Sequence, residues 1–433
     1  MAQPLRTWRT LAVIGAGTLA LAACGSSNSG TAAAPSSSAG TSSAAAGQNG
    51  ANGVLTIGTL LPQTGSLAFL GPPEFAGVDL AVKEINAAGG VLGKPITKID
   101  SDSGDTSTNI ASSSVDRLLS QKADVIIGAA SSGVSKTVID KIVGAGVVEF
   151  SPANTSPDFT NYPDKGLYFR TAPSDVLQGR VLGNLIVEDG NQTVGILALQ
   201  DAYGTGLSKN ISEAVKGSQG KVTPDPVIYD PKAAEFSAEV SKIKAADPEA
   251  IVVVGFDESA KIIQELVKQG ICPQQGKKLY LVDGNIGNAL GEKLPPNTLT
   301  GVKGTQPGAE APGDFRQKLL TVNPALKDFN YAGESYDAVI LTALAAIEAN
   351  SDAGVDIAKH LVDVSRQGTK CTTFKQCADL LKDKKDIDYD GISGPIEFSP
   401  KGDPLEATIN ISTYDAANKI LPTVVYKSGK LDG

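Results

Sequence analysis

The amino-acid sequence predicts an α/β protein with two doubly wound, parallel-sheet lobes, and three observations lead to that prediction. The chain has 433 residues, which exceeds the size at which a single core stops growing, so two domains are expected. From Val54 onward, short apolar runs alternate with segments of helical periodicity. These runs are apolar throughout, as in parallel strands that helices cover on both faces.

The first series of elements lies upstream of residue 153. Apolar runs at 54–62, 123–130 and 146–152 predict strands. A second helix is expected from about Ser132, after the second strand. The helix after the first strand is marked by apolar residues at helical spacing and a closing glycine pair: Phe75, Val78, Val82 and Ile85, then Gly89 and Gly90.

A second series begins with a helix near Ser174. Strands are predicted at 193–200, 250–255 and 279–283, again separated by helices. In open α/β sheets ligands bind at the carboxyl ends of the strands, so with two lobes we expect the site in the cleft between them. The last third changes character, with predicted helices at 311–320, 333–349 and 354–365 and predicted strands at 394–398, 406–413 and 420–427.

Composition and charge exclude several classes of function. The formal net charge is −9 and the chain has no Lys/Arg cluster of the kind that binds phosphate backbones, so we do not expect nucleic-acid binding. His360, the single histidine, falls in a helix pattern and is interpreted as a surface or hydrogen-bonded residue. The mature chain also lacks a nucleophile elbow, a P-loop and a dinucleotide fingerprint after a strand. We therefore predict a protein that is not an enzyme.

The N-terminus has the pattern of an export signal. Arg6 and Arg9 precede an apolar stretch, Leu11–Ala20, that is too short to span a bilayer. The stretch ends in Leu-Ala-Ala before Cys24. Small residues before a cysteine resemble a bacterial lipoprotein signal, in which the cysteine is lipidated and becomes the new N-terminus. An ordinary signal peptide with a chance cysteine is the alternative.

Residues 24–53 are predicted to be a flexible tether. The segment is rich in Ser, Ala and Gly, and no charge occurs between Arg9 and Glu74. Such a segment buries too little apolar surface to offset its ordering entropy. With residues 1–23 removed as a signal peptide, an anchor at Cys24 would hold a soluble body on the extracytoplasmic face of the cell membrane.

Three further cysteines follow Cys24. Cys371 and Cys377 are spaced for a short-loop disulfide in an oxidising compartment. Cys272 is left over and is interpreted as a buried, small apolar residue. Two cysteines and one histidine make a poor ligand set for zinc, so no metal is predicted.

Small hydrogen-bonding residues follow two neighbouring strands of the first lobe. Ser131 and Ser132 come after the strand that ends near Gly128, where backbone N–H groups and a helix N-terminus favour an anion. Thr155 and the backbone around Ala153 follow the next strand. Each group alone is explained equally well by N-capping and turn formation. Two of them at adjacent strand ends favour a cradle for a carboxylate.

The second lobe offers the opposite charge. Asp283 ends a predicted strand, where it either holds an ammonium group in the cleft or belongs to an Asp-Gly turn. Phe256, Asp257 and Tyr203 follow other strands and are expected to wall the same cleft. Opposed anion and cation sites are what a zwitterionic amino acid requires, because charge-assisted hydrogen bonds fix its orientation.

The stretch 386–397 has the acid spacing of an EF-hand calcium loop. An EF-hand also needs a helix after the loop, whereas Pro395 and the alternation of Ile396 and Phe398 predict a strand. That alternation directs Glu397 to solvent and away from the aspartates. We interpret the stretch as an acidic turn before a strand, with calcium binding as the alternative.

From about Val54 to Lys427 the sequence resembles the leucine/isoleucine/valine-binding branch of the type I periplasmic substrate-binding proteins of ABC importers. The resemblance covers nearly the whole mature chain in the family's order. It is carried by IGTLLPQTGSLAFLG, LAVKEINAAGGVLGKPI, VIIGAASSGVS, FSPANTSPDFT, YFRTAPSDVLQGRVLG, QDAYGTGLS, VDGNIGNAL and GISGPIEFSPKGD. It implies two lobes that are joined by three crossovers and close on a ligand like a hinge.

The resemblance also implies where the lobes begin and end. The N-terminal lobe would comprise 54–173 and 304–391, and the C-terminal lobe 174–303 and 392–430. Gly391 and Gly394 would supply permissive backbone in the third crossover.

The resemblance further implies a ligand site. Asp283 falls where the family has an acid for the ligand's α-ammonium, and aspartate in place of the common glutamate shortens the reach by one methylene. Leucine at position 70, where an aromatic residue can occur, implies an altered side-chain pocket. The α-carboxylate contacts are Ser132, Ala153 and Thr155, and the pocket walls are Tyr203, Phe256 and Leu70.

The function implied is the capture of an amino acid, branched-chain or otherwise small and aliphatic, by a monomer that uses no cofactor. The protein would deliver it to the permease subunits of an ABC importer. Family members also bind amides and aromatic acids. One alternative is a ligand sensor of the same fold for an amide or another small metabolite, signalling to a membrane partner. A secreted hydrolase is the other, and it lacks a nucleophile–base pair.

Overall fold

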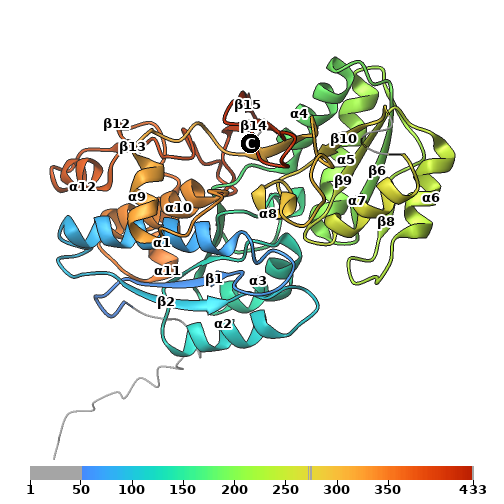
Figure 1. The fold of residues 1–433 in the computed structure, drawn as a ribbon. Coiled ribbons are helices and arrows are strands. Elements are labelled where there is room, and N and C mark those ends of the chain that lie inside the picture. The colour runs from blue at the N-terminus through green and yellow to red at the C-terminus, as the bar shows by residue number, and fades with distance from the viewer. Residues whose placement is uncertain (1–50, 272, 274–275, 432–433) are drawn as a thin grey trace, which may run out of the picture. The chain divides into compact units, whose positions relative to one another are not determined.

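The computed structural model describes residues 51–271, 273 and 276–431 (Figure 1). The predictions for the signal peptide, for lipidation at Cys24, for most of the tether and for Cys272 lie outside these residues. The described residues belong to one compact unit.

The first sheet is parallel, with strand order β2-β1-β3-β4-β5. Its strands are β1 (Thr56–Leu61), β2 (Thr97–Asp102), β3 (Val125–Gly128), β4 (Val148–Ser151) and β5 (Tyr168–Arg170). One face is covered by α1 (Gly71–Ala87), α10 (Ala332–Ala349) and α11 (Gly354–Leu361), and the other by α2 (Ile110–Ser120) and α3 (Ser132–Gly144) (Figure 1). All four residues of β3 are buried because both faces are covered, with Ile127 in one core and Ile126 in the other.

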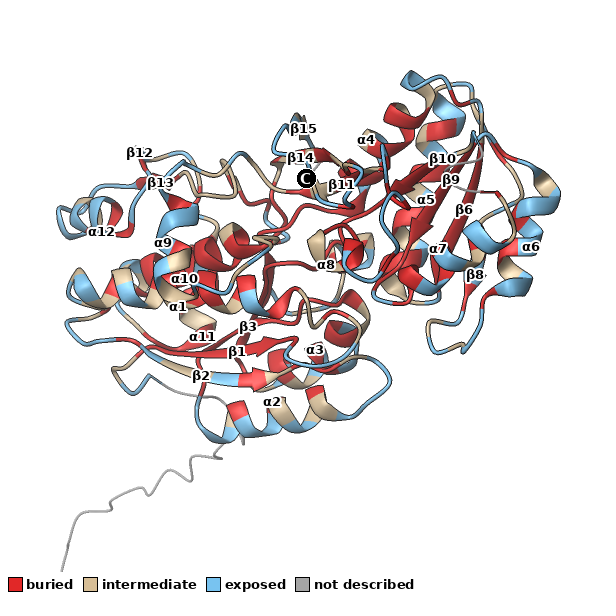
Figure 2. Cartoon of the chain, viewed as in Figure 1, coloured by how far each residue is buried: buried red, intermediate tan, exposed pale blue. Residues whose placement is uncertain are grey.

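The second sheet follows the order β15-β14-β11-β10-β9-β6-β7, with β8 paired to β6. Its strands are β6 (Thr193–Leu199), β7 (Lys221–Val222), β8 (Val227–Tyr229), β9 (Ala250–Val254), β10 (Lys278–Leu281), β11 (Lys303–Pro307), β14 (Glu406–Thr413) and β15 (Val425–Lys430). The neighbouring helices are α4 (Asp175–Glu188), α5 (Ala202–Gly217), α6 (Ser237–Ala246), α7 (Ser259–Lys268) and α8 (Asn288–Gly291). The strands pair in parallel except β14 and β15, which are antiparallel. In both sheets buried strands lie beside helices whose outer faces are exposed (Figure 2).

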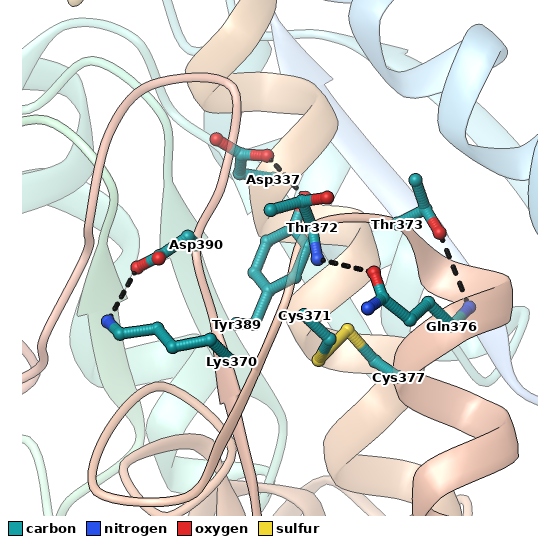
Figure 3. Close-up of a disulfide and its surroundings, with 9 residues drawn as sticks. All are labelled: Asp337, Lys370, Cys371, Thr372, Thr373, Gln376, Cys377, Tyr389 and Asp390. Carbon is teal, nitrogen blue, oxygen red and sulfur yellow. Dashed lines mark hydrogen bonds and ion pairs between the residues drawn. A yellow bond between two sulfur atoms is a disulfide. The ribbon is translucent and has the colours of Figure 1, made fainter.

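A small third sheet pairs β12 (Thr369–Cys371) with β13 (Ile387–Tyr389). Cys371 is disulfide-bonded to Cys377 in α12 (Phe374–Lys382), with 5.4 Å between their Cα atoms (Figure 3). The remaining elements are α9 (Phe315–Val322) and a short 3-10 helix, η1 (Pro157–Phe159). The disulfide therefore ties β12 to the helix that follows it.

Two of the predicted strands differ in the structure. Residues 394–398 form only an isolated bridge between Phe398 and Pro404. Glu397 adopts a positive φ of 48°, which interrupts the extended backbone on which side-chain alternation depends. The last strand is β15, several residues downstream of the predicted 420–427.

The expected lobe boundaries also shift. Residues 304–307 belong to β11 of the second sheet rather than to the first lobe. The segment around residue 400 lies against the first sheet instead of the second, because the Phe398 ring packs 5.9 Å from Phe150 and Arg170 N donates to Gly402 O. The boundary near residue 392 is thus decided by the burial of the Phe398 ring. The sequence pattern does not show against which sheet that ring packs.

The two glycines of the third connection differ in role. Gly394 has a φ of +131°, as expected for permissive backbone. Gly391 instead lies against α10, where an added Cβ would be 2.4 Å from Asp337 Oδ2. That carboxylate accepts bonds from the N–H groups of Ile392 and Ser393, at 3.0 and 2.7 Å, and so fixes the connection to the helix.

The calcium-like stretch surrounds a lysine. Lys370 Nζ lies 3.0 Å from Asp388 Oδ2, 2.9 Å from Asp390 Oδ1 and 3.6 Å from Glu397 Oε1. Figure 3 shows the pair of Lys370 and Asp390. The prediction that Glu397 points away from the aspartates is therefore wrong, because its left-handed backbone turns the side chain toward the same ammonium. An internal cation stands among these three carboxylates.

Across residues 51–271, 273 and 276–431, no single helix is long and apolar enough to cross a membrane. Helices α10 and α11 pass that test together by length and composition, with a bend of 103° between them.

Candidate functional site

A small, nearly filled cavity lies where the strand ends of both sheets meet. Six of the seven predicted contacts line it: Leu70, Ser132, Ala153, Tyr203, Phe256 and Asp283. Leu67, Ala130, Ser131, Gly284 and Tyr331 complete the lining. The free volume is about 10 Å³, room for about one water, so a larger ligand needs the walls to move apart.

The first-sheet side is built from two loops that hold each other in place. Ser131 Oγ caps α3 by accepting from Val134 N at 3.3 Å, and Ser132 Oγ accepts from Ser156 N at 3.3 Å. Asn154 Nδ2 donates to the carbonyls of Ala129 and Ala130, at 3.0 and 2.9 Å. Ser131 thus caps α3, as the capping interpretation predicted, whereas Ser132 joins α3 to the loop of Ser156, and both residues also line the cavity.

Thr155 does not line the cavity. It is buried beside it, and its carbonyl accepts from Asp175 N at 2.7 Å. Its loop is anchored by Arg170, whose Nη1 donates to Ser156 O at 2.8 Å and whose Nε lies 2.6 Å from Asp403 Oδ1. The fully buried Arg170 therefore positions this side of the site.

The second-sheet side centres on Asp283. Its Oδ1 accepts from Tyr203 OH at 2.6 Å and from Gln178 Nε2 at 2.9 Å, and its Oδ2 accepts from Tyr331 OH at 2.7 Å. All three donors are neutral. Burial raises the pKa of Asp283 above its ordinary value, although the three hydrogen bonds oppose that rise.

A second buried carboxyl lies near the first. Burial raises the pKa of Asp175 well above its ordinary value, and the proximity of Asp283 raises it further. The charge of Arg170 lowers the pKa of Asp175 in part, but within the described part of the chain no salt bridge is formed by either carboxyl. The pair therefore favours a positive group from outside the chain, since such a group would relieve both burial and repulsion. The arrangement can hold an ammonium.

The cavity wall on the second-sheet side is aromatic. The rings of Tyr203 and Phe256 stack with 5.4 Å between centroids and 11° between planes. Asp257, which we expected at this wall, instead pairs with Lys293 and does not line the cavity. Side chains for an apolar ligand group are supplied mainly by Leu67, Leu70 and this aromatic pair.

Three polar residues at this site, Asp175, Gln178 and Tyr331, are not among the predicted contacts. Asp175 and Gln178 stand in the SDVLQG segment at the start of α4, where two polar residues facing inward are a usable signal. Tyr331 precedes α10, 48 positions after Asp283, and local patterning gives it no signal.

His360 lies away from the cavity, in α11. Its Nδ1 is 3.6 Å from Glu348 Oε1 and 4.0 Å from Asp363 Oδ2, and both carboxylates are exposed. Within the part of the chain that the structure describes, these three residues are the group with metal-like spacing.

Comparisons with known proteins show the family of the chain. The family model described as "Periplasmic binding protein" matches residues 54–419. The Leu/Ile/Val-binding protein homolog 3 of Brucella melitensis is 28% identical over 366 residues, which are 83% of this chain and 91% of that protein. The substrate-binding protein BasB of a chemotactic signal transduction system in Halobacterium salinarum is 24% identical, over 84% of this chain and 87% of that protein.

The fold is also that of solved structures. The branched-chain amino acid transporter substrate-binding protein LivJ of Streptococcus pneumoniae, in complex with isoleucine, matches with a TM-score of 0.70 and 22% identity. The match covers 87% of this chain and all of that one. With a family model over most of its length and the matching α/β fold, this chain belongs to the periplasmic binding proteins of type I, a family of binding proteins.

Proposed function

We propose that the chain captures a small amino acid in the cavity around Asp283 and delivers it to an ABC importer from the extracytoplasmic side of the membrane. The observation that carries this proposal is the buried Asp283, held by three neutral donors and facing the start of α3 across the cavity. The Leu/Ile/Val-binding homologue of Brucella melitensis supports the same ligand class.

In this proposal each end of the ligand meets a different side of the cavity. The ammonium pairs with Asp283, with Asp175 adding negative charge behind it. The carboxylate meets the N-terminus of α3 and the loop of Ala153, where backbone N–H groups and the helix dipole favour an anion. A short aliphatic side chain fits against Leu67 and Leu70, because burial of its surface is favourable there.

We also propose that the two sheets are the cores of lobes that separate to admit the ligand. The connecting segments would be 171–174, 308–314 and 391–405, which join elements of one sheet to elements of the other. The nearly filled cavity supports this, because an amino acid has no room without such a motion. Lipidation at Cys24 would hold the protein at the membrane.

A thermal-shift screen of the mature protein against the twenty amino acids tests the ligand class. A ligand at 100 times its Kd adds about 2.7 kcal/mol to the free energy of unfolding, so a small aliphatic amino acid should raise Tm clearly. A protein that responds to no amino acid would contradict the proposal.

A ligand sensor is the second candidate. It is favoured by the similarity to the substrate-binding protein of a chemotactic system, which spans 84% of this chain. Reconstituted uptake separates the two, since a sensor binds the amino acid without supporting ATP-dependent transport by an ABC permease.

A further inference from the structure

A second cavity shares Tyr331 with the first and is lined by two of the three connecting segments. Its volume is about 360 Å³, within the range of small-molecule sites. Gly308 and Ala309 of the second connection line it, as do Ile392 and Ser393 of the third. It is therefore placed where a bound molecule would contact the segments that join the two sheets.

Glu334 lines this cavity and is only 5% exposed. Its carbonyl accepts from Thr171 Oγ1 of the first connection at 2.9 Å, and a Cβ added at Gly308 would lie 3.5 Å from its Oε1. Among the described residues, no side chain donates to its carboxyl and no cation pairs with it. The carboxyl keeps only a contact to its own backbone N–H.

The surroundings of Glu334 are acidic. Burial raises its pKa to about 8, and Asp337 one turn along α10 adds to that rise. Glu74, fully buried in the first turn of α1, has its own pKa raised by burial and by Glu334. An unpaired carboxyl among other acids favours a cation more than any other ligand group.

The two cations that line the cavity are engaged elsewhere. Arg316 lies over the Phe329 ring, 5.2 Å from its centroid, and Lys327 is paired with Glu292 at 2.9 Å. Much of the remaining wall is apolar, with Phe315, Ile420 and Leu421 as examples. The cavity combines one unpaired acid with a surface for a short hydrocarbon group.

Tyr331 connects the two cavities. It lines both of them, its OH donates to Asp283 Oδ2, and it stands three residues before Glu334 at the start of α10. A molecule held by Glu334 would therefore touch the residue that holds Asp283. By thermodynamic linkage, if this molecule changes the affinity of the cleft for the amino acid by some factor, the amino acid changes the affinity of the second cavity for the molecule by the same factor.

We propose that this second cavity binds a small organic ammonium, with its cation on Glu334 and its apolar part against Phe315 and Leu421. Occupancy changes the affinity of the cleft through Tyr331 and the three connections. The coupling rests on the proposed function, whereas the binding does not.

Calorimetric titration of the mature protein with n-pentylamine hydrochloride tests the binding, with n-pentanol as the neutral control. We expect the amine to bind the wild type and Asp283→Asn alike, and to bind Glu334→Gln at least about tenfold more weakly, because a charge-assisted bond is lost. The affinity of the wild type for pentanol should be no higher than the affinity of Glu334→Gln for the amine. Equal binding of the amine by wild type and Glu334→Gln, or loss of binding in Asp283→Asn, overturns the proposal.

Leu421→Trp provides a second variant that leaves Glu334 in place. Leu421 is 38% exposed, so the larger ring should fill the cavity without disturbing folding. We expect this variant to lose the amine and to keep the cleft amino acid. Undiminished amine binding by Leu421→Trp counts against the site, and amino-acid affinity that is identical with and without saturating amine overturns the coupling.

Discussion

The acidic cluster around Asp388 and the one around Asp283 have different counter-charges. Asp388, Asp390 and Glu397 surround the ammonium of Lys370, which belongs to the chain itself. Asp283 is surrounded by two tyrosine hydroxyls and a glutamine amide, all neutral. An acid whose cation is supplied internally has a structural role, whereas a buried acid without one is ready to receive a cation from a ligand.

The spacing of acids alone would favour the cluster around Asp388, and not Asp283, as the site for an external cation. The stretch 386–397 has the spacing of a calcium loop, yet its partner is a lysine 16 positions before its first aspartate. Asp283 stands alone in sequence, and its cluster is assembled from three distant elements. The counter-charge, rather than the spacing of the acids, distinguishes the two.

The largest effect is expected at a third acid, Asp403, whose internal cation is fully buried. Arg170→Met leaves Asp403 without its partner and frees the loop of Thr155, which should cost about 3–5 kcal/mol of unfolding free energy. Urea denaturation followed by circular dichroism measures the loss. The double variant Arg170→Met/Asp403→Leu is the control and should recover part of it; a single variant as stable as the wild type would break the comparison.

At the cleft, Asp283→Asn keeps the shape and removes the charge. Amino-acid affinity should fall by at least about 100-fold, because a buried charge-assisted contact is lost. Folding should be retained, since the change removes a buried carboxylate with a raised pKa. Calorimetry with the amino acid selected by the thermal-shift screen gives the affinity, and an unchanged Kd would remove Asp283 from the proposed site.

The affinity of the cleft should also depend on pH. A ligand ammonium favours the ionised form of Asp283, so protons compete with the ligand as the pH falls through the pKa of the free protein. Because burial raises that pKa, as it does for Asp175, the loss should begin above the usual carboxyl range near about pH 4. If one proton competes with the ligand, the affinity should fall by at most about tenfold for each unit by which the pH is lowered. A Kd that is flat down to pH 4 would show that neither carboxyl pairs with the ligand.

The smallest effect is expected at Lys370. Its side chain is 55% exposed, so Lys370→Gln should cost only about 1 kcal/mol of unfolding free energy and leave amino-acid affinity unchanged. Calcium should not shift the Tm of the wild type, because the ammonium already stands among the three carboxylates. Thermal-shift measurements on the wild type and on Lys370→Gln, each with and without calcium, check these expectations. A rise in the Tm of the wild type with calcium would show that the Asp388 cluster also accepts an external cation.

The sequence predicted much of this site because strand ends are readable locally. Ser132, Ala153, Tyr203, Phe256 and Asp283 each follow an apolar run, and the doubly wound fold brings such positions to one edge. Thr155 also follows an apolar run, but it lies beside the cavity, where its carbonyl accepts a hydrogen bond from Asp175 N. The side chains that complete the cluster come from helix starts, where Asp175 and Gln178 show an inward polar pattern but Tyr331 has no local signal.

By itself, the sequence determined the α/β alternation, the pairing of apolar runs with helices and the positions of most cavity residues, because hydrophobic periodicity and turn residues are local properties. Only the tertiary structure decided which charge neutralises which. Lys370 belongs to the calcium-like acids, Arg170 to Asp403, and Tyr331 links the cleft to Glu334. These partners are far apart along the chain, and Coulombic and hydrogen-bonding interactions depend on distance in space.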